Sequence, residues 1–446
     1  MHLGLMPSSK SRPHRYCRLV DDPDGITLIV GPNYSPEVTG IAPYTAGLAE
    51  ALLARDGGVE VVTTHPHYPE WSRYPGYSGW RRSESVNGVA VTRLSHLIPN
   101  GRSHLQRLLS EISFGLRVAF HRRTRPQRLL LVSPALFSAA IVAIVARIRW
   151  RGTPVAVWVQ DIYSSGVSET GVGGAVTAGV TRMVESALLR SADLVVVIHE
   201  RFRQTVVSSL GVDNARVRVI RNWSHLPEHF AVDRTVTRRR MGWLEDETIV
   251  LHSGNMGVKQ GLSSVVDAAR KLTPNDRIRF VLIGDGAMRS SLEEQAKGCR
   301  YISFIDPLPS EDYLPTLASA DLLLVNELPA LREMAVPSKL TSYFRSGVAV
   351  IAATDKGSTT AAELQGAEAG HRVDPGDPDA LIDGVRLLAA NSEMRRELGS
   401  AGRRYCAGVL SSSIVTEQYA DVLSNLTTRG SSRRGLRPSR WRRWGK

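Results

Sequence analysis

Short runs of Ile, Val and Leu alternate with amphipathic helical segments along most of the chain. Six such runs in the first half predict buried strands, at residues 26–30, 59–63, 89–94, 129–132, 155–159 and 194–198. Near-continuous apolar runs are typical of parallel strands that are covered by helices on both faces. Helical patterns at 42–53 and 135–150 lie between these runs. The first half therefore predicts a doubly wound α/β domain.

A polar stretch at residues 225–246 interrupts this pattern, and a second series of strands follows at 249–252, 280–283, 302–304, 322–325 and 348–351. We place the linker at 227–235. The predicted organisation is listed in chain order: a disordered tail at 1–25, a first Rossmann-like domain at 26–230, a second at 231–410, a helix at 411–428 that crosses back to the first domain, and a basic tail at 429–446. Two sheets that face each other create a cleft at the carboxyl ends of their strands, where ligands bind.

The loop after the first strand, residues 31–40, ends at Gly40 just before a predicted helix. Free N–H groups and the helix dipole at such a position suit a diphosphate, although a plain structural turn is the alternative. The loop is not GxGxxG, and the residues after the second strand, Thr63-Thr64-His65, include no acid. A nicotinamide enzyme is therefore disfavoured.

The second series opens with a glycine-rich stretch, residues 252–261, that contains Gly254, Asn255 and Lys259. Glycine lets a backbone approach phosphates closely, and Lys259 would place a positive charge against a leaving diphosphate. Gly284 and Gly286 follow the next strand and would face the same cleft. Each feature alone has a simpler alternative: Lys259 could be an ordinary solvated lysine near a turn, and Gly284 and Gly286 could only end a strand.

Six motifs together carry a resemblance that runs in order from about Ile26 to Asn425. They are Asn33-Tyr34-Ser35-Pro36-Glu37-x-Thr39-Gly40-Ile41, Pro66-His67-Tyr68-Pro69-x-Trp71, Val159-Gln160-Asp161, Asn222-Trp223-Ser224, Ser253-Gly254-Asn255-x-Gly257-x-Lys259-Gln260-Gly261-Leu262 and Pro337-Ser338-Lys339-Leu340-Thr341. The chain resembles the family-4 retaining glycosyltransferases, and within them the branch of colanic-acid and related exopolysaccharide enzymes. The resemblance implies the GT-B fold, a nucleotide-diphosphate sugar as a substrate rather than a cofactor, retention at the anomeric carbon, and no catalytic metal.

The chain departs from this family at one motif. Many members carry Glu-x7-Glu, which binds the donor sugar and the ribose, but alignment on Pro337 and Gly347 places Met334 and Ser342 at those positions. Glu333 lies one residue early. The resemblance implies that a donor segment formed by Glu333, Pro337, Ser338, Lys339 and Ser342 lies at this place. Ser342 would give the ribose one hydrogen bond without a carboxylate's charge, and Lys339 is either a diphosphate contact or a solvated helix lysine.

The acceptor is expected on the first domain, beside Glu37, Thr39, His67, Tyr68 and Gln160. Asp161 follows a predicted strand, so it would either act on the acceptor hydroxyl or cap a helix. Asp161 and Lys259 are our candidate catalytic residues. The leaving phosphate is the alternative to Asp161 as the group that takes the proton from the acceptor hydroxyl. No further ligand stands at metal spacing from the histidines, so we expect no metal. A catalytically inactive GT-B scaffold is the alternative function. A GT-B epimerase would need acid and base groups that we do not find.

Composition points to the reducing interior of a cell. Apolar residues make up 42% and charged residues 22%, as in soluble globular proteins, and Cys17, Cys299 and Cys406 form no paired pattern. Residues 1–25 have no apolar core of a signal peptide. We therefore expect a cytoplasmic protein, with a saccharide or lipid-linked saccharide as acceptor and no nucleic-acid partner, because no binding module accompanies its charge.

A membrane surface is a further expected partner. The net charge is +13, and residues 429–446 hold eight Lys or Arg and no acid, together with Trp441 and Trp444. A predicted helix at 105–120 carries an apolar stripe and is followed by more arginines. Either the stripe is buried on the sheet, or the helix and the tail bind anionic lipid at the inner face of the plasma membrane. The apolar stretch at 129–146 predicts a strand, a turn at Pro134 and a helix rather than a span.

Overall fold

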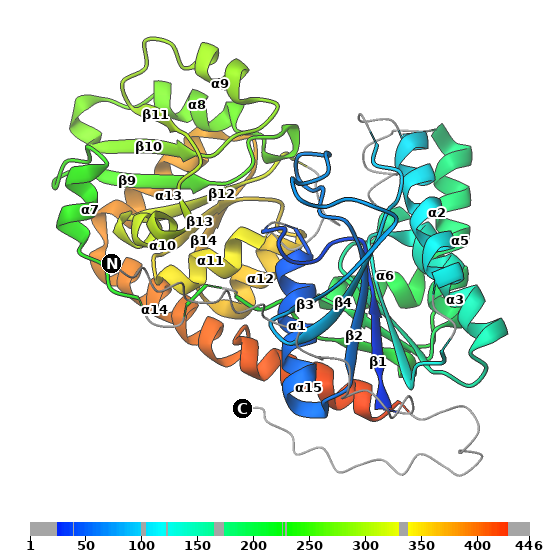
Figure 1. Ribbon diagram of the computed structural model, residues 1–446. Coiled ribbons are helices and arrows are strands. Elements are labelled where there is room, and N and C mark those ends of the chain that lie inside the picture. The colour runs from blue at the N-terminus through cyan, green and yellow to red at the C-terminus, as the bar shows by residue number, and fades with distance from the viewer. Residues whose placement is uncertain are drawn as a thin grey trace, which may run out of the picture.

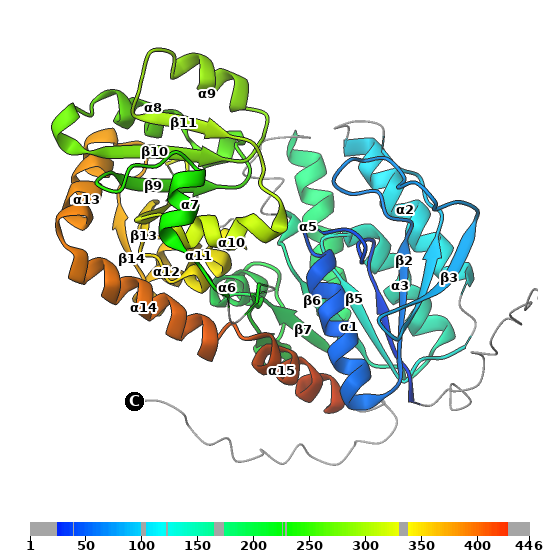
Figure 2. The ribbon, with the colours of Figure 1, turned by 60° about the vertical axis from the view of Figure 1, so that its left-hand side comes forward.

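The computed structural model describes residues 25–426 except 39, 100–103, 122–123, 165–173, 225, 228–229 and 330–337. Within these residues the chain forms two α/β domains, each built around one sheet (Figures 1 and 2). The first sheet has the order β3-β4-β2-β1-β5-β6-β7-β8, and only β3 is antiparallel to its neighbour. Its strands are β1 (Thr27–Val30), β2 (Val59–Thr64), β3 (Arg81–Val86), β4 (Val89–Leu94), β5 (Arg128–Val132), β6 (Val155–Val159), β7 (Leu194–Val197) and β8 (Val217–Val219).

Helices cover both faces of the first sheet, which is why its central strands are apolar throughout. On one face lie α1 (Ala42–Asp56) and α15 (Ser412–Ser424). On the other lie α2 (His104–His121), α3 (Leu136–Arg149), α5 (Gly174–Ser191) and α6 (Glu200–Ser208). The stretch predicted not to span a membrane is β5 followed by α3, and none of the helices in the described ranges is both long and apolar enough for a bilayer.

The second sheet is parallel and has the order β11-β10-β9-β12-β13-β14. Its strands are β9 (Thr248–Ser253), β10 (Ile278–Ile283), β11 (Ile302–Ile305), β12 (Leu322–Asn326), β13 (Val350–Ala353) and β14 (Gly370–Val373). One face packs against α8 (Ser263–Arg270), α9 (Arg289–Gln295) and α13 (Pro378–Ala390). The other packs against α10 (Ser310–Ser319), α11 (Ser338–Ser346), α12 (Thr359–Ala367) and α14 (Ser392–Gly408).

Two chain crossings join the domains. After β8 the chain passes to α7 (Arg234–Arg240), where the buried Arg238 donates to Asp321 at 2.9 Å and so anchors this helix on the second domain. The return follows α14: α15 lies on the first domain, where Arg55 donates to Asp421 at 2.8 Å. Between the domains, Glu363 of α12 forms an ion pair with Arg221 and accepts a hydrogen bond from Tyr405 at 2.9 Å.

The predicted GT-B class, with two Rossmann-like domains, is confirmed by this arrangement. Among the strands, the pattern did not reveal β3, β8 and β14, and in the polar stretch 225–246 it did not reveal the helix α7. β3 is an exposed edge strand with the sequence RRSESV, β8 has three residues, and three of the four residues of β14 are only partly buried. α7 carries three consecutive arginines, and it is held by an ion pair rather than by an apolar stripe. Apolar periodicity cannot detect elements whose residues do not bury apolar side chains.

Candidate functional site

The carboxyl ends of β9 and β10 meet in a pair of glycine turns. The strands are in parallel register with Ser253 opposite Ile283, so Gly254 and Gly284 leave the sheet side by side. Their φ angles are +123° and +136°, in the region that favours glycine. A Cβ on Gly284 would lie 2.0 Å from the carbonyl oxygen of Gly254. The two backbones therefore touch at a distance that no other residue type permits.

Hydrogen bonds hold these turns in place. Gly254 N donates to the carbonyl oxygen of Ile283 at 2.9 Å, and Met256 N donates to that of Asp285 at 2.8 Å. The Arg289 guanidinium donates to the Gly284 carbonyl oxygen at 2.8 Å from the first turn of α9. A backbone fixed in this way is preorganised, so charge that develops on a ligand meets dipoles already in position.

Lys339 lies beneath the Gly254 turn. Its Nζ is 3.4 Å from Nε2 of His252, and a Cβ on Gly254 would be 3.9 Å from the same nitrogen. Burial lowers the Lys339 pKa to about 8, while the nearby Glu327 carboxylate acts in the opposite direction. Burial also holds the pKa of His252 well below its usual range. Lys339 is therefore not a solvated helix lysine, because it projects under the backbone predicted to hold phosphates.

His252 presents a lone pair to this lysine. Its Nδ1 lies 3.3 Å from the carbonyl oxygen of Leu324, which can only accept, so Nδ1 carries the proton and Nε2 accepts from the ammonium group. Glu327 in turn accepts from the Thr360 hydroxyl at 2.5 Å and from Thr354. The sequence reasoning missed both His252 and Glu327. Glu327 directly follows β12, so the carboxyl-end rule that selected Gly254 would have found it.

Lys259 belongs to a short 3-10 helix, Val258–Gln260, whose backbone is fixed. Its carbonyl oxygen accepts from Leu328 N at 3.0 Å, and Gln260 Oε1 accepts from Gly257 N at 3.0 Å. Across the described ranges no residue gives the Lys259 ammonium group a hydrogen bond or an ion pair. Asn255 is exposed, and its Oδ1 would lie 2.6 Å from a Cβ on Gly286. The predicted glycines after β10, Gly284 and Gly286, therefore lie against the same turn as Gly254 and Asn255.

The remaining predicted donor residues lie in or before α11. Ser342 is 5% exposed, and its side chain hydrogen-bonds to Tyr313 inside the domain. Ser338 begins α11. Glu333 and Pro337 lie outside the described residues. Thr341 hydrogen-bonds to Tyr44 in the first turn of α1, which connects the donor segment to the first domain close to Gly40.

On the first domain, Glu37 joins two loops. It is 3% exposed, and its Oε1 accepts from the backbone N–H groups of His67 and Tyr68 at 2.8 and 2.9 Å. Its Oε2 accepts from the Asn33 amide at 2.8 Å. Glu37 therefore positions the loops after β1 and β2 rather than presenting a free carboxylate. Gly40 is exposed at φ +65°, and Thr39 lies outside the described residues.

Neutral imidazoles and aromatic rings line the same side. The rings of His67 and His96 are 4.7 Å apart, and Trp71 lies 5.9 Å from His67. Burial lowers the His96 pKa to about 3, with the neighbouring His67 acting in the same direction, and burial also lowers the His67 pKa. His96 was not singled out from the sequence because it stands in no motif. In the part of the chain that the structure describes, no group of three or more His, Cys, Asp or Glu residues is placed to hold a metal ion.

Gln160 and Asn222 form a reciprocal amide pair across β6 and β8. The Gln160 amide donates to Asn222 at 3.1 Å, and the Asn222 amide donates back at 2.7 Å. Asp161 follows directly and is exposed. Two predicted motifs that are 62 residues apart in sequence therefore contact each other, and they place an exposed carboxylate at the carboxyl end of the first sheet.

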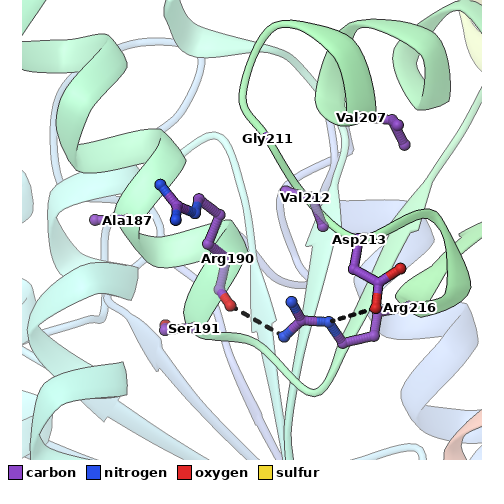
Figure 3. Close-up of a pocket in the computed structure, with 8 residues that line it drawn as sticks. All are labelled: Ala187, Arg190, Ser191, Val207, Gly211, Val212, Asp213 and Arg216. Carbon is purple, nitrogen blue, oxygen red and sulfur yellow. Dashed lines mark hydrogen bonds and ion pairs between the residues drawn. The ribbon is translucent and has the colours of Figure 1, made fainter.

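A pocket of about 660 Å³ lies elsewhere, at the end of α5 and before β8 (Figure 3). Arg216 donates there to the carbonyl oxygen of Arg190 at 3.0 Å and lies 3.9 Å from Asp213. Ser191 and Arg216 precede β7 and β8, so this pocket is at the amino ends of the strands. None of the predicted site residues lines it.

Comparisons with known proteins agree with this geometry. Residues 39–223 match the family model of the glycosyl transferase 4-like domain, and residues 233–405 match that of the glycosyl transferases group 1. The chain is 32% identical over 391 residues to the colanic acid biosynthesis glycosyl transferase WcaI of Escherichia coli, covering 83% of this chain and 94% of that protein. It is 26% identical to WbjE of Pseudomonas aeruginosa, a probable glycosyltransferase, over 60% of this chain and 64% of that one.

Solved structures share the fold at low identity. HepE of Anabaena, in complex with UDP and glucose, superposes with a TM-score of 0.65 at 16% identity, over 90% of this chain and 99% of that one. WaaG, which is involved in lipopolysaccharide biosynthesis, superposes with a TM-score of 0.64 at 16% identity, over 90% of this chain and 100% of that one.

Proposed function

Because the chain belongs to the glycosyl transferases of group 1, we propose that it transfers a hexose from a nucleotide-diphosphate sugar to a saccharide acceptor with retention of the anomeric configuration. The single observation that supports this most is the glycine turn pair with the Lys339 ammonium group beneath it. Lys259 follows the first of these turns in the sequence, in the short 3-10 helix. A cation and a preorganised backbone at one strand end suit a departing diphosphate, and Lys259 is proposed to supply a second cation.

The proposed chemistry needs few protein groups. The bond between the anomeric carbon and the diphosphate oxygen breaks, and the acceptor oxygen bonds to the same face of the sugar. Lys259 and Lys339 offset the charge that develops on the leaving oxygens. The acceptor proton passes either to the departing phosphate or to Asp161, which is exposed after β6. Retention is the property of the family that this chain resembles.

The acceptor is proposed to lie on the first domain, against His67, His96 and Trp71. The faces of neutral imidazoles and of an indole ring suit the apolar face of a sugar, and the ring nitrogens at their edges are polar. Because the relative WcaI is assigned by its name to colanic acid biosynthesis, we propose an exopolysaccharide intermediate, which is either free or lipid-linked, as the acceptor. A lipid-linked acceptor would require the enzyme to work peripherally at a membrane surface.

Two measurements test the donor and the stereochemistry. Titration calorimetry with a panel of nucleotide-diphosphate sugars should show binding for at least one donor, and UDP-sugars are tried first because HepE was solved with UDP. NMR of the transfer product should then show the same anomeric configuration as the donor. If no donor bound, the proposed transfer would be rejected. A product of inverted configuration would reject retention alone.

The Lys339 ammonium group should couple donor binding to pH. Its pKa of about 8 lies below the unfolded value near 10.4, so between these values the unfolded chain holds more protons and stability rises with pH. A bound diphosphate favours the charged lysine and raises its pKa. Near pH 9, about one unit above the free pKa, binding of UDP should therefore take up a proton. Calorimetry in two buffers of different ionisation enthalpy measures this uptake.

The matched variant is Lys339→Met, which keeps the length of the apolar stem and removes the charge. Proton uptake near pH 9 should disappear in this variant, and it should also be absent in the native chain at pH 6. Uptake that persisted in Lys339→Met would show that another group titrates, and Lys339 would then lose its place at the diphosphate.

A further inference from the structure

Exposed apolar side chains gather on three neighbouring helices of the first domain. Of the eighteen large hydrophobic residues exposed in the described part of the chain, eight lie on α2, α3 and α5. α2 and α3 pack together, as do α3 and α5, and all three cover one face of the first sheet (Figure 1). These eight residues, which we call the α2–α3–α5 face, are Leu105, Leu109, Leu116, Phe120, Ile144, Ile148, Val180 and Met183.

The α2 stripe predicted from the sequence points outward only in part: Leu105, Leu109 and Leu116 are exposed, Leu108 and Ile112 are partly buried, and Ala119 is buried. Phe120, which the prediction placed partly off the stripe, lies beside the three exposed leucines. Leu105, Leu109, Leu116 and Phe120 fall within about 60° of one another on a helix of 3.6 residues per turn. Their exposed fractions are 63, 45, 45 and 75%. Phe114 and Val118, on the opposite side of the helix, are 1 and 0% exposed and fill the core instead. Of the two alternatives for this stripe, burial holds for Ala119 and in part for Leu108 and Ile112. The remaining residues stay exposed because the sheet is already covered by the other side of α2.

The charges on these helices have one sign at the surface. The helices α2, α3 and α5 contain six arginines, Arg107, Arg117, Arg147, Arg149, Arg182 and Arg190, and only two carboxylates. Both carboxylates are turned inward: Glu111 accepts from Phe137 N at 2.8 Å, and Glu185 accepts from the N–H groups of Tyr163 and Ser164 at 2.8 and 3.0 Å. By contrast, α13 and α14 carry four carboxylates among their arginines and one exposed large hydrophobic residue, Leu387.

Trp80 extends the face beside α2. It is 73% exposed, and the guanidinium carbon of Arg117 lies 3.9 Å from the centroid of its ring. Tryptophan with a basic neighbour is typical of the boundary between lipid headgroups and acyl chains. The exposed apolar stripe, the arginines and this indole ring together combine the two attractions that hold a protein on anionic lipid.

From this arrangement we propose that the α2–α3–α5 face binds the surface of an anionic membrane. The apolar side chains enter the boundary below the headgroups, and the arginines meet lipid phosphates. A second copy of this chain is a poorer occupant, because two such faces would bring their arginines together while Glu111 and Glu185 are turned inward and Asp193 is already paired with Arg147 at 3.0 Å. The basic residues 429–446, which lie outside the described part, would add to this attraction. Membrane binding by this face would determine where the protein works and not which donor it uses.

Vesicle flotation with the full chain tests the proposal. The native chain should float with vesicles of phosphatidylcholine and phosphatidylglycerol at about 0.1 M salt, float less at roughly 1 M salt where the Debye length is about 3 Å, and not float with phosphatidylcholine alone. The variant Leu116→Ser/Phe120→Ser/Ile144→Ser/Ile148→Ser should lose about tenfold or more in vesicle binding. The control Val236→Ser/Leu244→Ser/Leu387→Ser/Ile414→Ser removes four exposed apolar residues elsewhere and should float like the native chain.

Three outcomes would overturn the proposal. They are a native chain that ignores anionic vesicles, a four-residue α2–α3 variant that floats as well as the native chain, and a variant whose main change is from dimer to monomer in sedimentation. The second result would assign binding to the basic tail, and the third would assign the face to a second copy. Flotation needs no turnover, so these results leave the proposed transfer standing. Donor binding by both four-residue variants, measured by calorimetry, confirms that they are folded.

Discussion

Replacing Lys259 by alanine is expected to lower transfer by about 2–4 kcal/mol in the activation barrier, which is roughly 30- to 1,000-fold in rate. The reason is that its ammonium group would contact the leaving diphosphate most strongly when negative charge develops there. No described residue neutralises this group, so the charge is available to a ligand. Its backbone, by contrast, is fixed by Leu328 and is not held by the side chain, so the substitution should leave the fold intact.

The effect should appear in kcat more than in donor affinity. A contact that forms fully only in the transition state lowers kcat and kcat/KM together when it is removed. Steady-state kinetics with saturating acceptor, over a range of donor concentrations, separates the two. Lys259→Arg keeps the charge on a longer and planar group, and it should retain part of the rate.

A second lysine serves as the matched control. Lys271 is exposed and paired with Asp379 at 2.6 Å, so Lys271→Ala also removes one positive charge from the second domain and should leave transfer unchanged. If Lys259→Ala retained the full rate, or if both variants lost it equally, Lys259 would not stabilise the leaving group. A general loss of positive potential would then be the explanation.

The sequence predicted the parts of this molecule that depend on apolar periodicity. All eleven predicted strands correspond to observed strands, because the central strands of both sheets are buried on both faces and cannot tolerate polar residues. The boundary between the domains and the edge strands of the sheets were harder to predict from the sequence. β3 alternates charged and polar residues on an exposed edge, and the start of the second domain depends on the ion pair between Arg238 and Asp321 rather than on apolar residues.

The candidate site was predictable where backbone geometry determines the residue type. Gly254, Gly284 and Gly286 were selected as glycines at strand ends, and each has a φ angle that favours glycine. Partners brought together by tertiary packing were not predictable. His252 is a buried strand residue in sequence, and only the fold places it 3.4 Å from Lys339, 87 positions later. Glu37 was expected to face the acceptor, but its three hydrogen bonds to loop groups give it a positioning role that no local pattern indicates.

Replacing Gly284 by alanine should destabilise the second domain by about 3–5 kcal/mol and abolish donor binding. The new Cβ would lie 2.0 Å from the carbonyl oxygen of Gly254 and 3.2 Å from its nitrogen, and neither backbone atom can move without breaking the bond from Gly254 N to Ile283. Gly298→Ala is the control: its φ of +77° is also positive and so strained for alanine, although less than the +136° of Gly284, and nothing lies within 4 Å of the added carbon. The control should cost only about 1–2 kcal/mol from backbone strain and leave donor binding unchanged.

Urea unfolding measures both losses of stability, and calorimetry with the donor measures binding. The difference between the two variants reports the contact between the turns together with the larger backbone strain at φ +136°. Equal losses of stability, or donor binding retained in Gly284→Ala, would mean that the two turns do not meet closely enough to form the proposed diphosphate site.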